Sequence, residues 1–252
     1  MSKPPRVLVI AGSDSSGGAG IQADIKTITM LAGYAMTAIT AVTAQNSVGV
    51  QAVEVMPTGL VIAQIESCLS DIGVDAVKIG MLGSAAIANA VRDLLTGLPK
   101  AIPIVFDPVM VATSGGVLAD VETSAAFEQL MDLATLTTPN VAELAALGGH
   151  AAMARRGVAY LAKGGDADGQ MIEDRLVRPV QADRVWQASR IETRHTHGTG
   201  CTLASAIATG LATGLDLEQA IDRARQFVHA ALLAAPGFGQ GHGPLGHAAV
   251  RP

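Results

Sequence analysis

Short runs of apolar residues alternate with longer segments in which apolar residues recur every three or four positions. The short runs, rich in Val, Ile and Leu, are typical of buried strands, and the longer segments predict amphipathic helices. This alternation continues along the chain without a repeat or a linker. Because strands that alternate with helices form a parallel sheet covered on both faces, we expect one α/β domain over residues 1–252, with three layers (α/β/α) and a mostly parallel central sheet.

The expected strands cover residues 6–11, 36–42, 50–56, 76–79, 104–106, 158–162, 171–177 and 191–193. The first helix is expected to bury Ile21, Ile25, Ile28 and Leu31, and the second, capped by Thr58, to bury Ile62, Ile65, Leu69 and Ile72. Further helices are expected at 85–95, capped by Ser84, at 121–133, in a short turn after Asn140, and at 201–213 and 217–235.

The composition supports a folded α/β domain that lies outside a membrane. Hydrophobic residues make up 49% of the 252 residues and charged residues 15%, which excludes a disordered chain. The formal net charge of −5 provides no basic field, so we expect no nucleic-acid partner. The apolar run at 7–11 is far shorter than a membrane span, and we expect no membrane association. With two cysteines and no secretion signal, the expected compartment is the cytoplasm.

Most polar and glycine-rich sequence falls directly after the expected strands. These segments are residues 12–20, Gln45, 78–81, 107–110, 140–143, 163–166 and 195–201. Ligands of open α/β sheets bind beyond the carboxyl ends of the strands, where such segments meet. The sequence therefore predicts a site at this edge of the sheet.

The glycine-rich segment at 12–20 is ambiguous on its own. It lacks the Gly-Lys-Ser/Thr ending of a P-loop and the glycine spacing of a dinucleotide-binding turn. A structural turn explains it as well as a ligand does, although Asp14 and Asp24 nearby favour the close approach of a small ligand.

The segment at 195–201, His-Thr-His-Gly-Thr-Gly-Cys, points more directly to chemistry. Gly198, Thr199 and Gly200 precede a helical run, and free N–H groups at a helix start bind anions; the alternative is a simple tight loop. At this position the Cys201 thiol is expected to have a lowered pKa and to be reactive, whereas Cys68 is expected to be an inert core thiol. The two histidines lack the further ligands that zinc requires.

Acidic and amide side chains follow two other strands. Asp107 comes directly after residues 104–106, and Asn140 and Glu143 follow the next strand end. Carboxylate oxygens suit a hydrated Mg²⁺, although Asn140 alone could simply cap a helix. Together with the anion-binding segment and Lys163, these groups indicate phosphoryl transfer by positioning and charge neutralisation.

Several motifs in order resemble the hydroxymethylpyrimidine/phosphomethylpyrimidine kinases, which belong to the ribokinase-like kinases. The resemblance implies a ribokinase-like fold, ATP as co-substrate, Mg²⁺ as cofactor and a homodimer. It also implies phosphorylation of 4-amino-5-hydroxymethyl-2-methylpyrimidine, and then of its monophosphate, in thiamine biosynthesis. The motifs are Gly17-Gly-Ala-Gly-Ile-Gln-Ala-Asp24, Ala44-Gln-Asn46, Lys78-Ile-Gly-Met81, Asp107-Pro-Val-Met110, Thr138-Pro-Asn140, Lys163-Gly-Gly165 and His197-Gly-Thr-Gly-Cys201.

The resemblance also implies a role for each matching residue. Cys201 would be the base, with Gly198, Thr199 and Gly200 as the anion hole. Asp107 and Glu143 would organise Mg²⁺ together with Asn140. The ATP-binding residues would be Asn140, Lys163, Thr199 and Gly200. Gln45 would read the aminopyrimidine edge in a pocket formed by Ala19, Met81 and Val109, with Asp24 nearby.

The sequence departs from the family at two places. Asp166 stands where the family usually has His, and the segment at 149–158 is short, so a helix there is expected to be trimmed to a turn or two. Residues 113–116 are expected to belong to a mobile flap. Two other functions remain open: a pyridoxal kinase of the same superfamily, and a non-catalytic pyrimidine sensor, against which the intact acidic residues and Cys201 argue.

Overall fold

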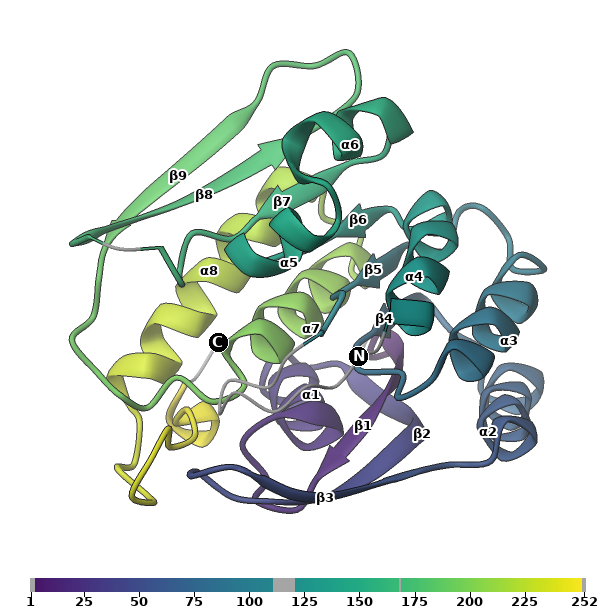
Figure 1. Ribbon diagram of the computed structural model, residues 1–252, viewed down its shortest axis with the longest axis horizontal. Coiled ribbons are helices and arrows are strands. Elements are labelled where there is room, and N and C mark those ends of the chain that lie inside the picture. Colours follow the sequence, from purple (N-terminus) through teal and green to yellow (C-terminus); the bar gives the residue numbers. More distant parts are fainter. Residues whose placement is uncertain (1–2, 111–120, 168, 251–252) are drawn as a thin grey trace.

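The computed structural model describes residues 3–110, 121–167 and 169–250, and its strands form one nine-stranded sheet (Figure 1). The strands are β1 (Arg6–Asp14), β2 (Tyr34–Gln45), β3 (Val50–Val55), β4 (Ala76–Ile79), β5 (Ile104–Phe106), β6 (Leu136–Thr137), β7 (Tyr160–Ala162), β8 (Met171–Val177) and β9 (Arg184–Ser189). Their order in the sheet is β3-β2-β1-β4-β5-β6-β7-β8-β9. The strands from β2 to β7 in this order are parallel, and β3, β8 and β9 are antiparallel to their neighbours.

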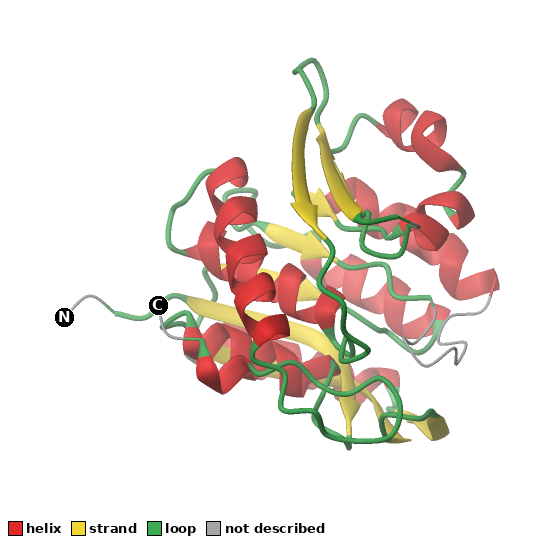
Figure 2. Ribbon diagram, turned by 90° about the vertical axis from the view of Figure 1, so that its left-hand side faces the viewer, coloured by secondary structure: helices red, strands yellow, loops and turns green. Residues whose placement is uncertain are grey.

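Helices cover both faces of this sheet, as Figures 1 and 2 show. One face packs against α1 (Gly20–Met30), α7 (Thr199–Ala212) and α8 (Leu217–Leu233). The other packs against α2 (Thr58–Asp71), α3 (Ala85–Leu95), α4 (Val121–Leu133), α5 (Val141–Ala146) and α6 (Gly149–Arg156). A short 3-10 helix, η1 (His247–Ala249), lies near the C-terminus. The predicted three-layer, mostly parallel α/β fold is confirmed.

The central strand β1 shows why this sequence forms a sheet buried on both sides. Val7 and Val9 pack into the core under α1, α7 and α8, whereas Leu8 and Ile10 pack into the opposite core. All four side chains are fully buried. Because successive strand residues point to opposite faces, an unbroken apolar run is what a strand covered on both faces requires.

Three sequence expectations about element positions and caps can be compared with the structure. Residues 191–193 form no strand, and the antiparallel edge strand β9 precedes them. Pro57, not Thr58, is the N-cap of α2, and Ile72 is exposed beyond the end of this helix. The cap of α3 by Ser84 is confirmed, because its side chain accepts a hydrogen bond from Ile87 N–H.

The buried face of α1 also differs from the expectation. Ile21 and Ile28 are buried, but Ile25 is 39% exposed. The fully buried Asp24 takes its place on the inner face. Apolar periodicity misplaced this face by about one residue, because a carboxylate paired inside the core is invisible to a hydrophobic pattern.

Two expectations concern the middle of the chain. Helix α6 spans eight residues, about two turns, in agreement with the expected short segment. The flap expected at residues 113–116 lies outside the described residues. Among the residues that the structure describes, no helix combines the length and apolar character needed to cross a membrane.

Candidate active site

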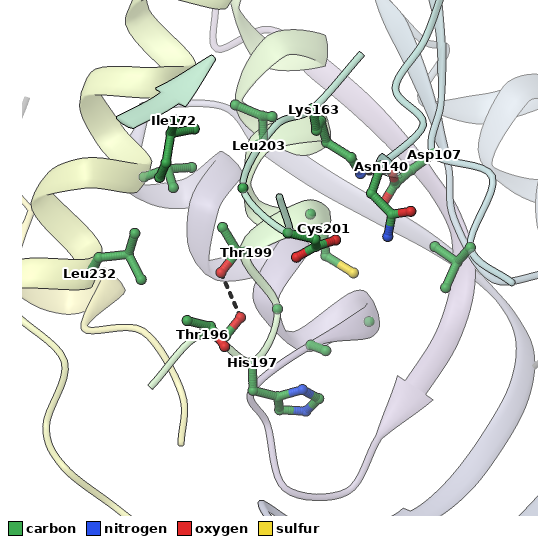
Figure 3. A pocket seen from close by; sticks show the side chains of 18 of the residues that line it. Asp107, Asn140, Lys163, Ile172, Thr196, His197, Thr199, Cys201, Leu203 and Leu232 are labelled. Carbon is green, nitrogen blue, oxygen red and sulfur yellow. Dashed lines mark hydrogen bonds and ion pairs between the residues drawn. The ribbon is translucent and has the colours of Figure 1, made fainter. Parts of the chain in front are cut away.

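A cavity of about 390 Å³ lies at the carboxyl ends of the parallel strands, against the start of α7 (Figure 3). Every site residue expected from the sequence lines it except Asp24. The lining residues among them are Ala19, Gln45, Met81, Asp107, Val109, Asn140, Glu143, Lys163, Gly198, Thr199, Gly200 and Cys201. Asp166, the departure from the family pattern, lines the same cavity. Parallel strands thus bring these distant segments together at one edge of the sheet.

The start of α7 is shaped by two glycines. Gly198 is the N-cap with φ +85°, and a Cβ atom there would lie 1.9 Å from the Gly18 carbonyl oxygen. A Cβ atom on Gly200 would lie 3.3 Å from Lys163 Nζ and 3.4 Å from Asp107 Oδ2. The glycines therefore let an acidic and a basic side chain approach the free N–H groups of a 14-residue helix, where anions are favoured.

Lys163 stands between two carboxylates and lies close to Gly200 at the start of α7. Its Nζ lies 2.8 Å from Asp107 Oδ1 and 4.0 Å from Glu143 Oε2. The Thr138 hydroxyl also donates to Asp107 Oδ1, at 2.9 Å. Burial alone would raise the pKa of Asp107, but the ammonium groups of Lys163 and Lys78 hold it below its usual value. Asp107 is therefore ionised at neutral pH.

Glu143 is held by the start of α5. Its side chain accepts from Asn140 N–H, and Asn140 Oδ1 accepts from Glu143 N–H, both at 2.8 Å. This capping box confirms that Asn140 caps a helix, and it does so while lining the cavity. Burial raises the pKa of Glu143 to about 7, against the opposing effect of Lys163. Glu143 is thus poised to lose its proton when a cation arrives.

Cys201 lies in the first turn of α7, within the cavity lining. The expected low pKa of its thiol is wrong: burial raises it to about 11, although the Lys78 ammonium favours the thiolate. The loss of hydration outweighs the position at a helix start, so the thiol is protonated at neutral pH. Burial also raises the pKa of Cys68, a partly buried residue of α2 that packs against the core.

Asp24 lies beneath the cavity. Its carboxylate oxygens are 2.9 and 3.0 Å from Lys78 Nζ, and the Ser205 hydroxyl donates to it at 2.7 Å. Both charged side chains are 0% exposed. Ser205 is one turn beyond Cys201 on the same side of α7. The network therefore ties α1 and β4 to the helix that carries the anion site.

The end of the cavity near β1 and β2 contains the residues expected to hold a heterocycle. Gln45 Oε1 accepts from the Thr43 hydroxyl at 3.1 Å, while Ala19, Met81 and Val109 line the same region. The apolar residues Ile172, Leu203 and Leu232 line the cavity on the far side of Thr199 (Figure 3). Sequence reasoning missed these three, because single aliphatic residues on separate elements carry no signal of a ligand.

Sequence reasoning also assigned no contact to Asp14 and His197. Their side chains meet at 2.8 Å, and both residues are almost fully buried in the cavity lining. The only signal was their position: each lies in a polar segment that follows an expected strand. The contact itself joins residues 183 positions apart, which a single sequence does not reveal.

A helix start, a lysine and paired carboxylates at the carboxyl edge of this sheet define a small-molecule phosphotransferase of the ribokinase-like fold. The sequence matches the family described as phosphomethylpyrimidine kinase over residues 14–246. The chain belongs to this family, as its motifs predicted.

Individual relatives agree with this assignment. The chain is 46% identical to a hydroxymethylpyrimidine/phosphomethylpyrimidine kinase of Rhizobium meliloti, over 95% of this chain and 96% of the relative. The phosphomethylpyrimidine kinase structure from Clostridium difficile superposes with a TM-score of 0.75 at 37% identity, covering 89% of this chain and 98% of that one. The pyridoxal kinase of Staphylococcus aureus in complex with AMP-PCP and pyridoxal gives 0.88 at 30% identity, covering 98% and 95%.

Proposed function

We propose that the protein transfers the γ-phosphoryl group of ATP to 4-amino-5-hydroxymethyl-2-methylpyrimidine, and a second one to the resulting monophosphate, in thiamine biosynthesis. One observation carries the proposal. The start of α7 lies directly against Lys163 and Asp107 in the cavity lining, so that helix N–H groups and charged side chains are gathered at one place. The relatives named as kinases of this pyrimidine and its phosphate support the substrate.

The lining of the cavity supports a division into two ends. The γ-phosphate would lie beside Lys163 and the start of α7 at Gly200, since both favour negative charge. The apolar region around Ile172, Leu203 and Leu232 suits the adenine of ATP. The region around Gln45 and Met81 suits the pyrimidine, because an amide can donate to and accept from a heterocyclic edge.

The chemistry of the donor set supports a Mg²⁺ ion beside the phosphates. Asp107 and Glu143 supply the carboxylates that Mg²⁺ takes together with phosphate oxygens and water. Asp107 Oδ2 faces the space that a Cβ on Gly200 would fill, and thus lies toward the anion site. When bound, Mg²⁺ would neutralise charge on the transferred phosphoryl group.

The residues support a direct transfer. The hydroxyl oxygen of the substrate forms a bond to the γ-phosphorus while the bond from that phosphorus to the bridging oxygen breaks, and ADP leaves with the electron pair. The proposed acceptor of the hydroxyl proton is Cys201 Sγ in its thiolate form, which is the minor form at neutral pH because burial raises the pKa of this thiol to about 11 against the effect of the Lys78 ammonium. Lys163 and the start of α7 stabilise the charge that spreads over the phosphoryl oxygens.

A second candidate is a pyridoxal kinase. The structural similarity to a pyridoxal-bound kinase favours it, and pyridoxal is also a hydroxymethyl heteroaromatic. The identity to that kinase is 30%, against 46% to the Rhizobium meliloti pyrimidine kinase. The pyrimidine is therefore the substrate we propose.

Phosphorus NMR of the products distinguishes these functions. Purified protein with ATP and Mg²⁺ is incubated separately with the pyrimidine, its monophosphate and pyridoxal. We expect monophosphate and then diphosphate from the pyrimidine. A reaction that stops at the monophosphate with excess ATP contradicts the two-step activity, and turnover of pyridoxal alone favours the second candidate. No turnover of any of the three favours a non-catalytic sensor.

A Gln45→Leu variant tests the pyrimidine end of the cavity in the same assay. Loss of the polar group leaves the ring edge unpaired, which typically costs ~1–3 kcal/mol, so both phosphorylations should slow by similar factors. The KM for ATP should remain within about twofold, since a contact made only to the ring does not reach the nucleotide. An unchanged rate for both steps would show that Gln45 does not bind the substrate.

The homodimer and the cytoplasmic location stay predictions. Strand β3 forms one edge of the sheet, with Val53 and Val55 exposed, and an unpaired apolar strand edge is a surface that a second copy can cover. Light scattering of the purified protein tests the dimer, and the mass of a single chain would contradict it.

A further inference from the structure

The Asp14 carboxylate organises the glycine loop at residues 17–20. Asp14 is the last residue of β1, is 3% exposed and accepts hydrogen bonds from the backbone N–H groups of Gly18 at 3.1 Å and Ala19 at 2.8 Å. Ser16 adds its own N–H and hydroxyl, both at 2.8 Å. Burial opposes the charge of Asp14, but these donors and His197 hold its pKa below the usual value. An ionised carboxylate therefore fixes the backbone of this loop.

His197 connects this loop to the anion site. Its Nε2 lies 2.8 Å from Asp14 Oδ2, and the next residue, Gly198, is the N-cap of α7. A Cβ atom on Gly18 would lie 2.4 Å from His197 Cδ2, so the imidazole lies directly against the loop backbone. The His197 backbone N–H in turn donates to the Gly243 carbonyl at 3.1 Å. The two glycine segments thus meet through one buried side-chain contact.

The same contact affects Gln45. Because an ionised carboxylate only accepts, His197 Nε2 carries the proton that it donates to Asp14. Gln45 Nε2 lies 3.4 Å from that nitrogen, which then has no lone pair to accept from it. The Thr43 hydroxyl lies 3.1 Å from both Gln45 Oε1 and the Ser13 carbonyl oxygen, and it has one proton to donate. The Gln45 amide, which lines the cavity, therefore lies directly beside the Asp14–His197 contact.

We propose that Asp14 and His197 are positioning residues for the heteroaromatic substrate. Their hydrogen bond holds the loop at 17–20 against the start of α7, next to the Gln45 amide in the cavity lining. The proposal rests on the proposed function for the identity of the substrate. It adds two residues that act through Gln45 and the loop, without contact to the reacting atoms.

Three variants separate this role from a general effect on folding. Asp14→Asn preserves size, but its amide cannot accept from His197 and from all the loop N–H groups, since one of its ends is a donor. His197→Leu removes the donor, whereas His197→Gln retains an N–H close to the position of Nε2. Asp75→Asn is the matched control, because Asp75 also accepts from a backbone N–H and a side chain but lies away from the cavity.

The first measurement is steady-state kinetics with the pyrimidine and ATP. Asp14→Asn and His197→Leu should each raise the KM for the pyrimidine about tenfold, the usual effect of one lost charge-assisted hydrogen bond, with the KM for ATP within about twofold. His197→Gln should recover most of this loss, and Asp75→Asn should match the wild type. An unchanged KM for the pyrimidine, or equal defects in His197→Gln and His197→Leu, would overturn the proposal.

The second measurement needs no substrate. Amide hydrogen exchange in the peptide containing residues 17–20 should be about tenfold faster in Asp14→Asn and His197→Leu than in the wild type, because the loop N–H groups lose their acceptor or its anchor. Equal exchange in all variants would refute the positioning of the loop. If wild-type protein fails to phosphorylate the pyrimidine, the proposed function fails, and this exchange measurement still decides whether the Asp14–His197 contact holds the loop.

Discussion

Replacement of Asp24 by Asn tests the ion pair beneath the active site. Asp24 and Lys78 are both 0% exposed, and their charged atoms lie 2.9 and 3.0 Å apart. Burial alone would lower the pKa of Lys78, but Asp24 holds it above its usual value. The amide of the variant fits the same space and leaves a buried ammonium without its counter-charge.

The expected cost follows from this burial. Removing one partner of a fully buried pair typically costs about 3–5 kcal/mol, a large share of the ~5–15 kcal/mol that stabilises most domains. The partly exposed pair between Arg6 and Asp75 is the control: its side chains are 39% and 34% exposed. Asp75→Asn should cost much less than Asp24→Asn, because water screens the charges of this pair.

Urea denaturation at pH 7 measures both costs. The chain has one tryptophan, Trp186, which is largely buried, so its fluorescence reports unfolding. The double variant Asp24→Leu/Lys78→Met should recover most of the loss, since it removes the unpaired charge. The reasoning is refuted if Asp24→Asn costs no more than Asp75→Asn, or if the double variant is less stable than Asp24→Asn alone.

Three further predictions concern the site itself. Glu143→Gln should lower Mg²⁺-dependent turnover by ~10²–10³, which is the usual loss for one group that stabilises charge in the transition state. Unchanged turnover would show that Glu143 does not take part in the reaction. The wild-type carboxyl keeps its proton to about pH 7 when folded but loses it near 4.5 when unfolded. The stability advantage of Glu143→Gln should thus grow between these pH values, reaching about 3 kcal/mol, and a pH-independent difference in urea denaturation would contradict this cause. Cys201 should react slowly with iodoacetamide at pH 7, and its rate of labelling should rise as the pH approaches 11. Bound substrate should slow this labelling. Fast labelling at pH 7 would show that burial does not raise the pKa of the thiol.

The sequence by itself determined the fold class and the edge of the sheet that carries the site. Apolar runs separated by amphipathic segments produce the buried parallel strands, and these bring their following polar segments to one cavity. Asp107, Asn140, Glu143, Lys163 and residues 198–201 could therefore be selected from the order of residues alone. Each follows a strand end or begins a helix, and such local features are encoded in short stretches of chain.

Tertiary structure decided the state and partners of the charged groups. Asp24 lies outside the cavity lining and pairs with Lys78. Burial raises the pKa of the Cys201 thiol, and the side chains of Asp14 and His197 are in contact. None of these follows from local sequence, because the energy of a charge depends on which atoms replace its water. Those atoms come from segments far apart in the chain, and only their packing fixes how much hydration each group loses and which partner compensates for it.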